Sequence, residues 1–248
     1  EIIFNILRGK FEIDKKSSAK DQKNDKKILT YIRNFYNSCI DTDLMDKQGN
    51  QPLLTFLDQL KLNDRNYNDT AILSNTIAEL HNYDVGTLFN MELAIPPSKS
   101  DNKNYILSIT ENSGTFDNYE DSESVDIYRK EIKAILSIVY GNRKDKNIDK
   151  MIEAIIKFEK KISLIANKHV FIEEDYDDNT ITYQDLIKKY PFINWKLYFK
   201  KRYETIIDNF NDIPKNVEIL LFPSEYFEEL NKAFTKTDTE TIAIYLEW

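Results

Sequence analysis

One stretch of the chain constrains its fold more than any other. Between Ile148 and Ala166, apolar residues recur every three or four positions, which places their side chains on one face of an α-helix. The stripe consists of Met151, Ile155, Phe158, Ile162 and Ile165, widened by Ile152 and Ile156. A stripe of this width predicts a helix buried against two neighbours rather than the narrow seam of a coiled coil.

The same spacing recurs along the chain and predicts a mainly α fold. Further helices are predicted over 28–40, 70–81 and 125–140, from Pro52, after a Thr182 cap, from Pro191, and twice after residue 221. Short strands are predicted near 91–95, 104–109 and 217–221, which adds a minor β element to this multi-helix fold. The polar segment Asp14–Asp25 is predicted to be a mobile connector.

Length and charge restrict the domain organisation and the class of partner. The 248 residues could form one large domain or two small ones, and we predict a single helical domain over 1–248. The net charge of −8 argues against a surface that binds nucleic acid or an anionic membrane. No apolar run is long enough to predict a membrane span, and because Glu1 is not a methionine we expect an excised or processed piece.

Few residues in the chain have the chemistry of a metal or modification site. Zinc catalysis on a helix uses two histidines one turn apart with a glutamate between them, whereas His81 and His169 are far apart, so neither is predicted to bind metal. The single cysteine, Cys39, cannot form an internal disulfide, which fits a cytosolic protein as well as an extracellular one. Asn68–Asp69–Thr70 is a glycosylation sequon, which has meaning only in a secreted protein.

Five segments follow one another in a characteristic order. They are Phe35–Ile40, Gly49–Leu54, Phe158–Ile165, Pro191–Trp195, and the closing tract from Leu220 to Trp248. In this order they resemble the N-terminal half of the neprilysin and endothelin-converting-enzyme family of zinc metallopeptidases. The region 110–119 departs from the family pattern, because it lacks the prolines and the arginine that the family often has there.

The resemblance implies a function for the whole protein rather than for this chain alone. The chain would be the helical cap domain of a neprilysin-like zinc metalloendopeptidase that hydrolyses peptides, restricting access and helping to bind substrate. Zinc would belong to a C-terminal catalytic domain absent from this chain, which alone should bind no zinc and be inactive. Two alternatives remain open: a non-catalytic helical binding or scaffolding module derived from the same family, and an unrelated intracellular helical scaffold.

The resemblance also implies which residues meet the substrate. Arg8 matches an arginine that holds the C-terminal carboxylate of the peptide, and Phe4 matches a pocket wall, whereas Asn5 stands where the family has an acid. A planar guanidinium can bind a carboxylate through two hydrogen bonds, although Arg8 could equally be an ordinary solvated helix residue.

The compartment follows from the same resemblance. Cys39 matches a family cysteine that bridges to a cysteine outside the chain, and the alternative is a buried free thiol. We therefore expect an extracellular or membrane-anchored ectodomain, in which Asn68 is a candidate for glycosylation.

Overall fold

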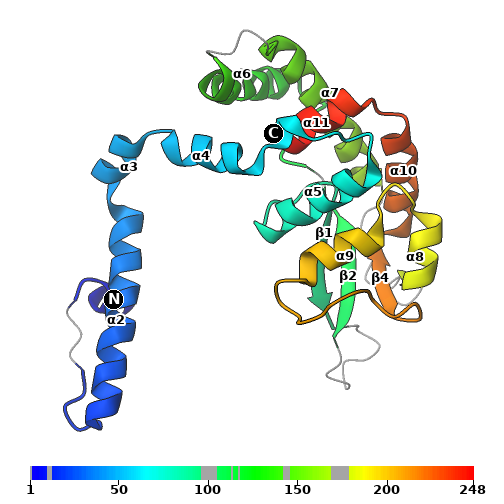
Figure 1. Ribbon diagram of the computed structural model, residues 1–248. Helices are drawn as coiled ribbons and strands as arrows, with labels where there is room; N and C mark the ends of the chain where they lie inside the picture. Colours follow the sequence, from blue (N-terminus) through cyan, green and yellow to red (C-terminus); the bar gives the residue numbers. More distant parts are fainter. Residues whose placement is uncertain are drawn as a thin grey trace. The chain divides into compact units, whose positions relative to one another are not determined.

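The structure is a computed structural model of the chain (Figure 1). It describes residues 2–9, 13–95, 105–112, 114–116, 118–141, 146–168 and 179–248. The chain divides into two compact units, Glu1–Gln59 and Leu60–Trp248. The sequence-based assignment of one domain to residues 1–248 stays a prediction.

The first unit is helical throughout its described elements. They are α1 (Ile2–Leu7), α2 (Ala19–Ile40), α3 (Thr42–Gln48) and α4 (Gln51–Leu60). Pro52 lies in the first turn of α4, as predicted. The prediction of a connector over Asp14–Asp25 is wrong from Ala19 onward, because the side chain of Ser18 accepts a hydrogen bond from the backbone N–H of Asp21 and caps α2.

The apolar stripe predicted on α2 exists, but its own unit does not bury it. No residue of α2 is buried, and the side chains of Tyr31 and Phe35 are 62% and 73% exposed. The helix therefore keeps an apolar face on its surface, which burial within the described part of the chain does not stabilise.

The second unit is built around α7 (Ile148–Lys168). All seven residues of the predicted stripe are buried, and α7 packs against α6 (Ser122–Tyr140), α10 (Ser224–Thr235) and α11 (Thr239–Glu247). The stripe is wide because the helix has neighbours on more than one side, which confirms the interpretation of its width.

A four-stranded sheet forms the other part of this unit. Its strands are β1 (Phe89–Ala94), β2 (Ile106–Glu111), β3 (Thr180–Thr182) and β4 (Glu218–Phe222), in the order β1-β2-β4-β3. Strands β2 and β4 are parallel, and the other two pairs are antiparallel. The three predicted strands are confirmed, whereas β3 was missed because three residues carry too little alternation to be recognised.

Two helices, α5 (Thr70–Asn82) and α9 (Trp195–Tyr203), lie side by side and cross the sheet (Figure 1). The ring of Phe89 on β1 lies 5.4 Å from that of Trp195 and 5.5 Å from that of Tyr198, centre to centre. These contacts fix β1 against α9, and the ring of His81 on α5, 5.0 Å from that of Phe89, adds a contact to the second helix. Phe89 and His81 both line the pocket described below.

The remaining elements follow the expected caps with one exception. Thr182 caps α8 (Tyr183–Lys189) as predicted, and a short 3-10 helix, η1, spans Leu62–Asp64. The helix predicted from Pro191 begins at Trp195 instead, because the side chain of Asn194 accepts a hydrogen bond from the N–H of Leu197 and caps the helix there.

The described elements confirm a mainly α fold with a minor β element. None of the described helices combines the length and the apolar composition that a membrane span needs.

Candidate functional site

The segment that resembles a substrate-binding tract forms α1 and the turn after it. Phe4 and Asn5 lie in α1, and Arg8 lies in the turn. The guanidinium carbon of Arg8 is 4.0 Å from the centre of the Phe4 ring, a cation–π contact. Phe4 and Arg8 are exposed, whereas Asn5 is half-buried. The structure thus brings Phe4 and Arg8 together, and among the described residues no carboxylate pairs with Arg8.

Arg33, which the sequence did not single out, holds this segment against α2. Its Nε donates a 3.0 Å hydrogen bond to the carbonyl oxygen of Ile6. Gly9 closes the turn with φ of 81°, a left-handed conformation that favours glycine, and a Cβ atom there would lie 3.8 Å from the guanidinium carbon of Arg33. Arg33 is therefore a positioning residue for the turn that presents Arg8.

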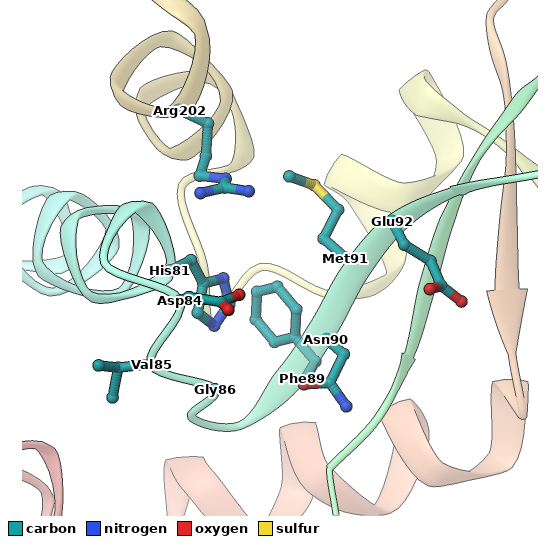
Figure 2. A pocket seen from close by; sticks show the side chains of 9 residues that line it. All are labelled: His81, Asp84, Val85, Gly86, Phe89, Asn90, Met91, Glu92 and Arg202. Atoms are coloured by element: carbon teal, nitrogen blue, oxygen red, sulfur yellow. The ribbon is translucent and has the colours of Figure 1, made fainter. Parts of the chain in front are cut away.

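A pocket of about 300 Å³ lies in the second unit, at the free edge of the sheet (Figure 2). It is lined by His81, Asp84, Val85, Gly86, Phe89, Asn90, Met91, Glu92 and Arg202. Consecutive residues of a strand point to opposite faces of its sheet. Because residues 89–92 all line the pocket, it follows the edge of β1 rather than one face of the sheet.

His81 is a neutral bridge within this pocket. Its Nδ1 lies 2.7 Å from the hydroxyl of Tyr198 and its Nε2 lies 3.1 Å from the hydroxyl of Thr87, with the donor roles set by the tautomer. Burial, with a smaller contribution from the Arg202 charge, lowers the pKa of His81 to about 3. Since both ring nitrogens are engaged, His81 has no free position for a metal or for proton transfer.

Arg202 lines this pocket with a guanidinium that is only partly hydrogen-bonded. Its Nη1 donates a 2.6 Å hydrogen bond to Oδ1 of Asn82, whereas its Nε is buried without a hydrogen bond to the described residues. Asp84 and Glu92 also line the pocket, but neither comes within 4.0 Å of the Arg202 guanidinium. The described lining of the pocket therefore presents separate charges of both signs.

A family comparison decides what kind of chain this is. The model for the N-terminal part of Peptidase family M13 matches residues 3–248. The chain belongs to Peptidase family M13. The resemblance to the neprilysin family that the sequence indicated is thereby confirmed.

Solved structures support the fold of this M13 chain. The crystal structure of the Mycobacterium tuberculosis zinc metalloprotease Zmp1 in complex with an inhibitor has a TM-score of 0.70 and 16% identity, covering 100% of this chain and 35% of that one. The cryo-EM structure of Zmp1 in its open state gives 0.66 and 17%, covering 88% and 32%. The M13 chain thus spans about a third of the length of these neighbours. No curated protein sequence matches it.

The described residues of the M13 chain were compared with the ligand set of a zinc site. Among the residues that the structure describes, no three His, Cys, Asp or Glu side chains are grouped as metal ligands would be. His169 lies outside the described residues. No zinc chemistry is therefore assigned to the described residues of this chain.

The two candidate modification residues of the M13 chain are accessible. Cys39 is exposed at the end of α2 rather than buried. Asn68 is exposed before α5, and its Oδ1 accepts a 2.6 Å hydrogen bond from the hydroxyl of Thr239. This bond leaves the amide nitrogen of Asn68, the atom that a glycan would modify, without a partner among the described residues.

Proposed function

We propose that this chain is the N-terminal cap domain of a neprilysin-like zinc metalloendopeptidase that hydrolyses peptides. The observation that carries the proposal is the match of the M13 family model to residues 3–248, nearly the whole chain. The fold is similar to about a third of a zinc metalloprotease, which leaves room in such a protein for a separate catalytic domain. Zinc binding and the activation of water belong, in this proposal, to a C-terminal domain of the same polypeptide.

A peptidase assay on the full-length protein tests this assignment. We expect cleavage of unstructured peptides by the zinc-loaded protein, loss of cleavage in a chelator, and recovery when zinc is restored. Cleavage that persists in the chelator would refute the zinc mechanism. The 248-residue chain on its own should not cleave peptides, since zinc chemistry is assigned to the other domain.

Within this function, the Phe4–Arg8 segment is proposed to bind the substrate. Arg8 is exposed, lacks a carboxylate partner among the described residues, and stacks on the Phe4 ring, so its planar fork is available to the C-terminal carboxylate of a peptide. The hydrogen bond from Arg33 supports this role, because it limits the motion of the turn that carries Arg8. Asn5 provides no charge that would orient Arg8.

The test of Arg8 compares peptides that differ only at their C-terminus. In Arg8→Gln, kcat/KM for peptides with a free carboxylate should fall roughly ten- to a hundredfold, the usual range for a hydrogen bond to a charged group. Peptides with an amidated end should lose much less. Arg129→Gln is the matched control, because Arg129 is a partly exposed arginine of α6 that already pairs with Glu153. Equal losses for both peptide types would assign Arg8 to the ordinary surface.

The alternative is a non-catalytic binding or scaffolding module derived from the same family. Asn5 in place of the family's acid, and the departure of region 110–119 from the family pattern, favour it. Zinc-replete full-length protein that binds peptides and never cleaves them would support this alternative.

Localisation outside the cytoplasm is part of the proposal. We expect an extracellular or membrane-anchored ectodomain in which Cys39 bridges to a cysteine outside this chain and Asn68 carries a glycan. The exposure of both residues supports this. Mass spectrometry of the protein from its natural source would test it, since a reduced Cys39 together with an unmodified Asn68 would count against the secretory route.

A further inference from the structure

A buried glutamate lies in the core of the second unit, whereas Arg8 belongs to the first unit. Glu159 of α7 is 1% exposed. Among the described residues no lysine, arginine or histidine nitrogen lies within 4.0 Å of its carboxylate. A buried carboxylate without a cation is rare in proteins, because removing its charge from water is costly unless that charge is compensated.

Two phenols compensate only one of the two carboxylate oxygens. The hydroxyls of Tyr119 and Tyr128 donate to Oε2 of Glu159 over 3.0 Å and 2.7 Å. The indole Nε1 of Trp248 donates to the Tyr128 hydroxyl over 3.2 Å, which leaves the proton of Tyr128 for Glu159. No hydrogen bond to Oε1 is present among the described residues. The arrangement thus satisfies Oε2 and leaves Oε1 available.

Glu159 lines a hollow of about 270 Å³. Glu159 and Gly114 both line this hollow, and Oε1 lies 4.0 Å from the position that a Cβ on Gly114 would take. Gly114 has φ of 86°, so the backbone there is in a conformation that suits glycine and places no side chain over the carboxylate. Tyr245 and Trp248 form part of the wall.

The chemistry of this hollow suits one class of ligand. It combines an available carboxylate oxygen with aromatic side chains, the pair of features that proteins use to bind guanidinium and ammonium groups. Its volume lies just below the range of drug-sized sites, which fits the end of one long side chain. We propose that the hollow beside Glu159 binds an organic cation, the guanidinium or alkylammonium group of a basic side chain.

The test uses a pair of probes that differ in charge and hardly in shape. Nα-acetyl-arginine amide carries the guanidinium, and Nα-acetyl-citrulline amide replaces it with a neutral urea. Titration of the 248-residue chain should give saturable binding of the arginine probe, roughly tenfold or more tighter than the citrulline probe. Glu159→Gln should abolish this difference, while the control Glu153→Gln, an exposed glutamate of the same helix, should retain it. Equal binding of the two probes would overturn the proposal.

A second measurement needs no variant at the buried position. The chain has 2 tryptophans, and only Trp248 lines the hollow. In an NMR titration the chemical shift of the Trp248 indole N–H should change when the arginine probe is added and should not change with the citrulline probe. The indole N–H of the buried Trp195 should keep its chemical shift with both probes. A Trp248 signal that does not respond to a saturating arginine probe would also overturn the proposal.

The source of the cation is distinguished by repeating the titration on the full-length protein. Binding that persists there assigns the hollow to a basic side chain of a ligand, and binding that disappears assigns it to a basic side chain of the longer polypeptide. Failure of the cation proposal would leave the peptidase assignment intact, because that assignment rests on the family match and on zinc-dependent cleavage.

Discussion

The neutral state of His81 makes the stability of the second unit depend on pH. In the folded protein burial keeps the pKa of His81 near 3, whereas an unfolded histidine has a pKa of about 6.5. As the pH falls below 6.5, His81 becomes protonated in the unfolded chain but stays neutral in the folded chain. The contribution of His81 to the free energy of unfolding is therefore fully present above pH 6.5 and is lost progressively toward pH 3.

The size of the effect follows from the two pKa values. At pH 5 the unfolded histidine is about 1.5 pH units below its pKa, while the folded one is still neutral. At about 1.4 kcal/mol per unit, folding becomes less favourable by roughly 2 kcal/mol between pH 7.5 and pH 5. This is a measurable fraction of the stability of a domain.

Urea unfolding of the parent and of His81→Gln at the two pH values measures this contribution. Tryptophan fluorescence follows the correct unit, because Trp195 and Trp248 both belong to it. The parent should lose about 2 kcal/mol more than the variant on acidification. The pKa of Glu111 is raised by burial and acts in the opposite direction, but Glu111 and His169 are present in both proteins and cancel in the comparison. An equal loss in the two proteins would refute the neutral state of His81.

Three further predictions test the fold. Ile155→Ala removes a fully buried side chain of α7 and should lower the free energy of unfolding by about 2–5 kcal/mol. The control Leu164→Ala, on the exposed face of the same helix, should change that free energy by no more than about 0.5 kcal/mol. Similar losses in the two variants would contradict the assignment of the buried face. Asn194→Ala removes the cap of α9 and should lower the free energy of unfolding, measured by chemical denaturation, by about 1 kcal/mol. An unchanged denaturation midpoint would mean that the Asn194 cap does not explain why α9 begins at Trp195 rather than at Pro191. Arg33→Met should release α1, seen as faster amide hydrogen exchange at residues 4–8 with an unchanged second unit, while unaltered exchange would mean that Arg33 does not hold the turn.

The elements that could be predicted from the sequence are those with long and simple periodicity. The apolar stripe of α7 could be predicted from residue spacing alone, because every residue in it is buried in the interior. The start of α9 could not be obtained in this way, because Pro191 and Asn194 are both good starting residues and tertiary contacts choose between them. The indole of Trp195 donates to the carbonyl of Tyr190, a contact that fixes the turn and that no local pattern contains.

The candidate sites were less accessible to sequence reasoning than the helices. Phe4 and Arg8 could be identified through a family resemblance, and their i, i+4 spacing is consistent with the ring contact. Arg33 and Glu159 act through partners far away in the sequence. Glu159 lies within Phe158–Ile165, a segment that carries the family resemblance, but that pattern gave it no role of its own. The polar position of Glu159 next to the stripe of α7 was the one available signal, because a charged residue bordered by Phe158 and Ile162 has to find its partners inside the protein.

The two hollows described above share part of their walls. Val85 and Gly86 line both the cavity along the β1 edge and the one beside Glu159. This stretch is anchored at its end by the Tyr245 and Tyr226 hydroxyls, which donate to the carbonyl oxygens of Thr87 and Leu88. A ligand in one hollow that displaces Val85 and Gly86 changes the affinity of the other hollow for its own ligand. Thermodynamic linkage requires that the second ligand change the affinity for the first by the same factor.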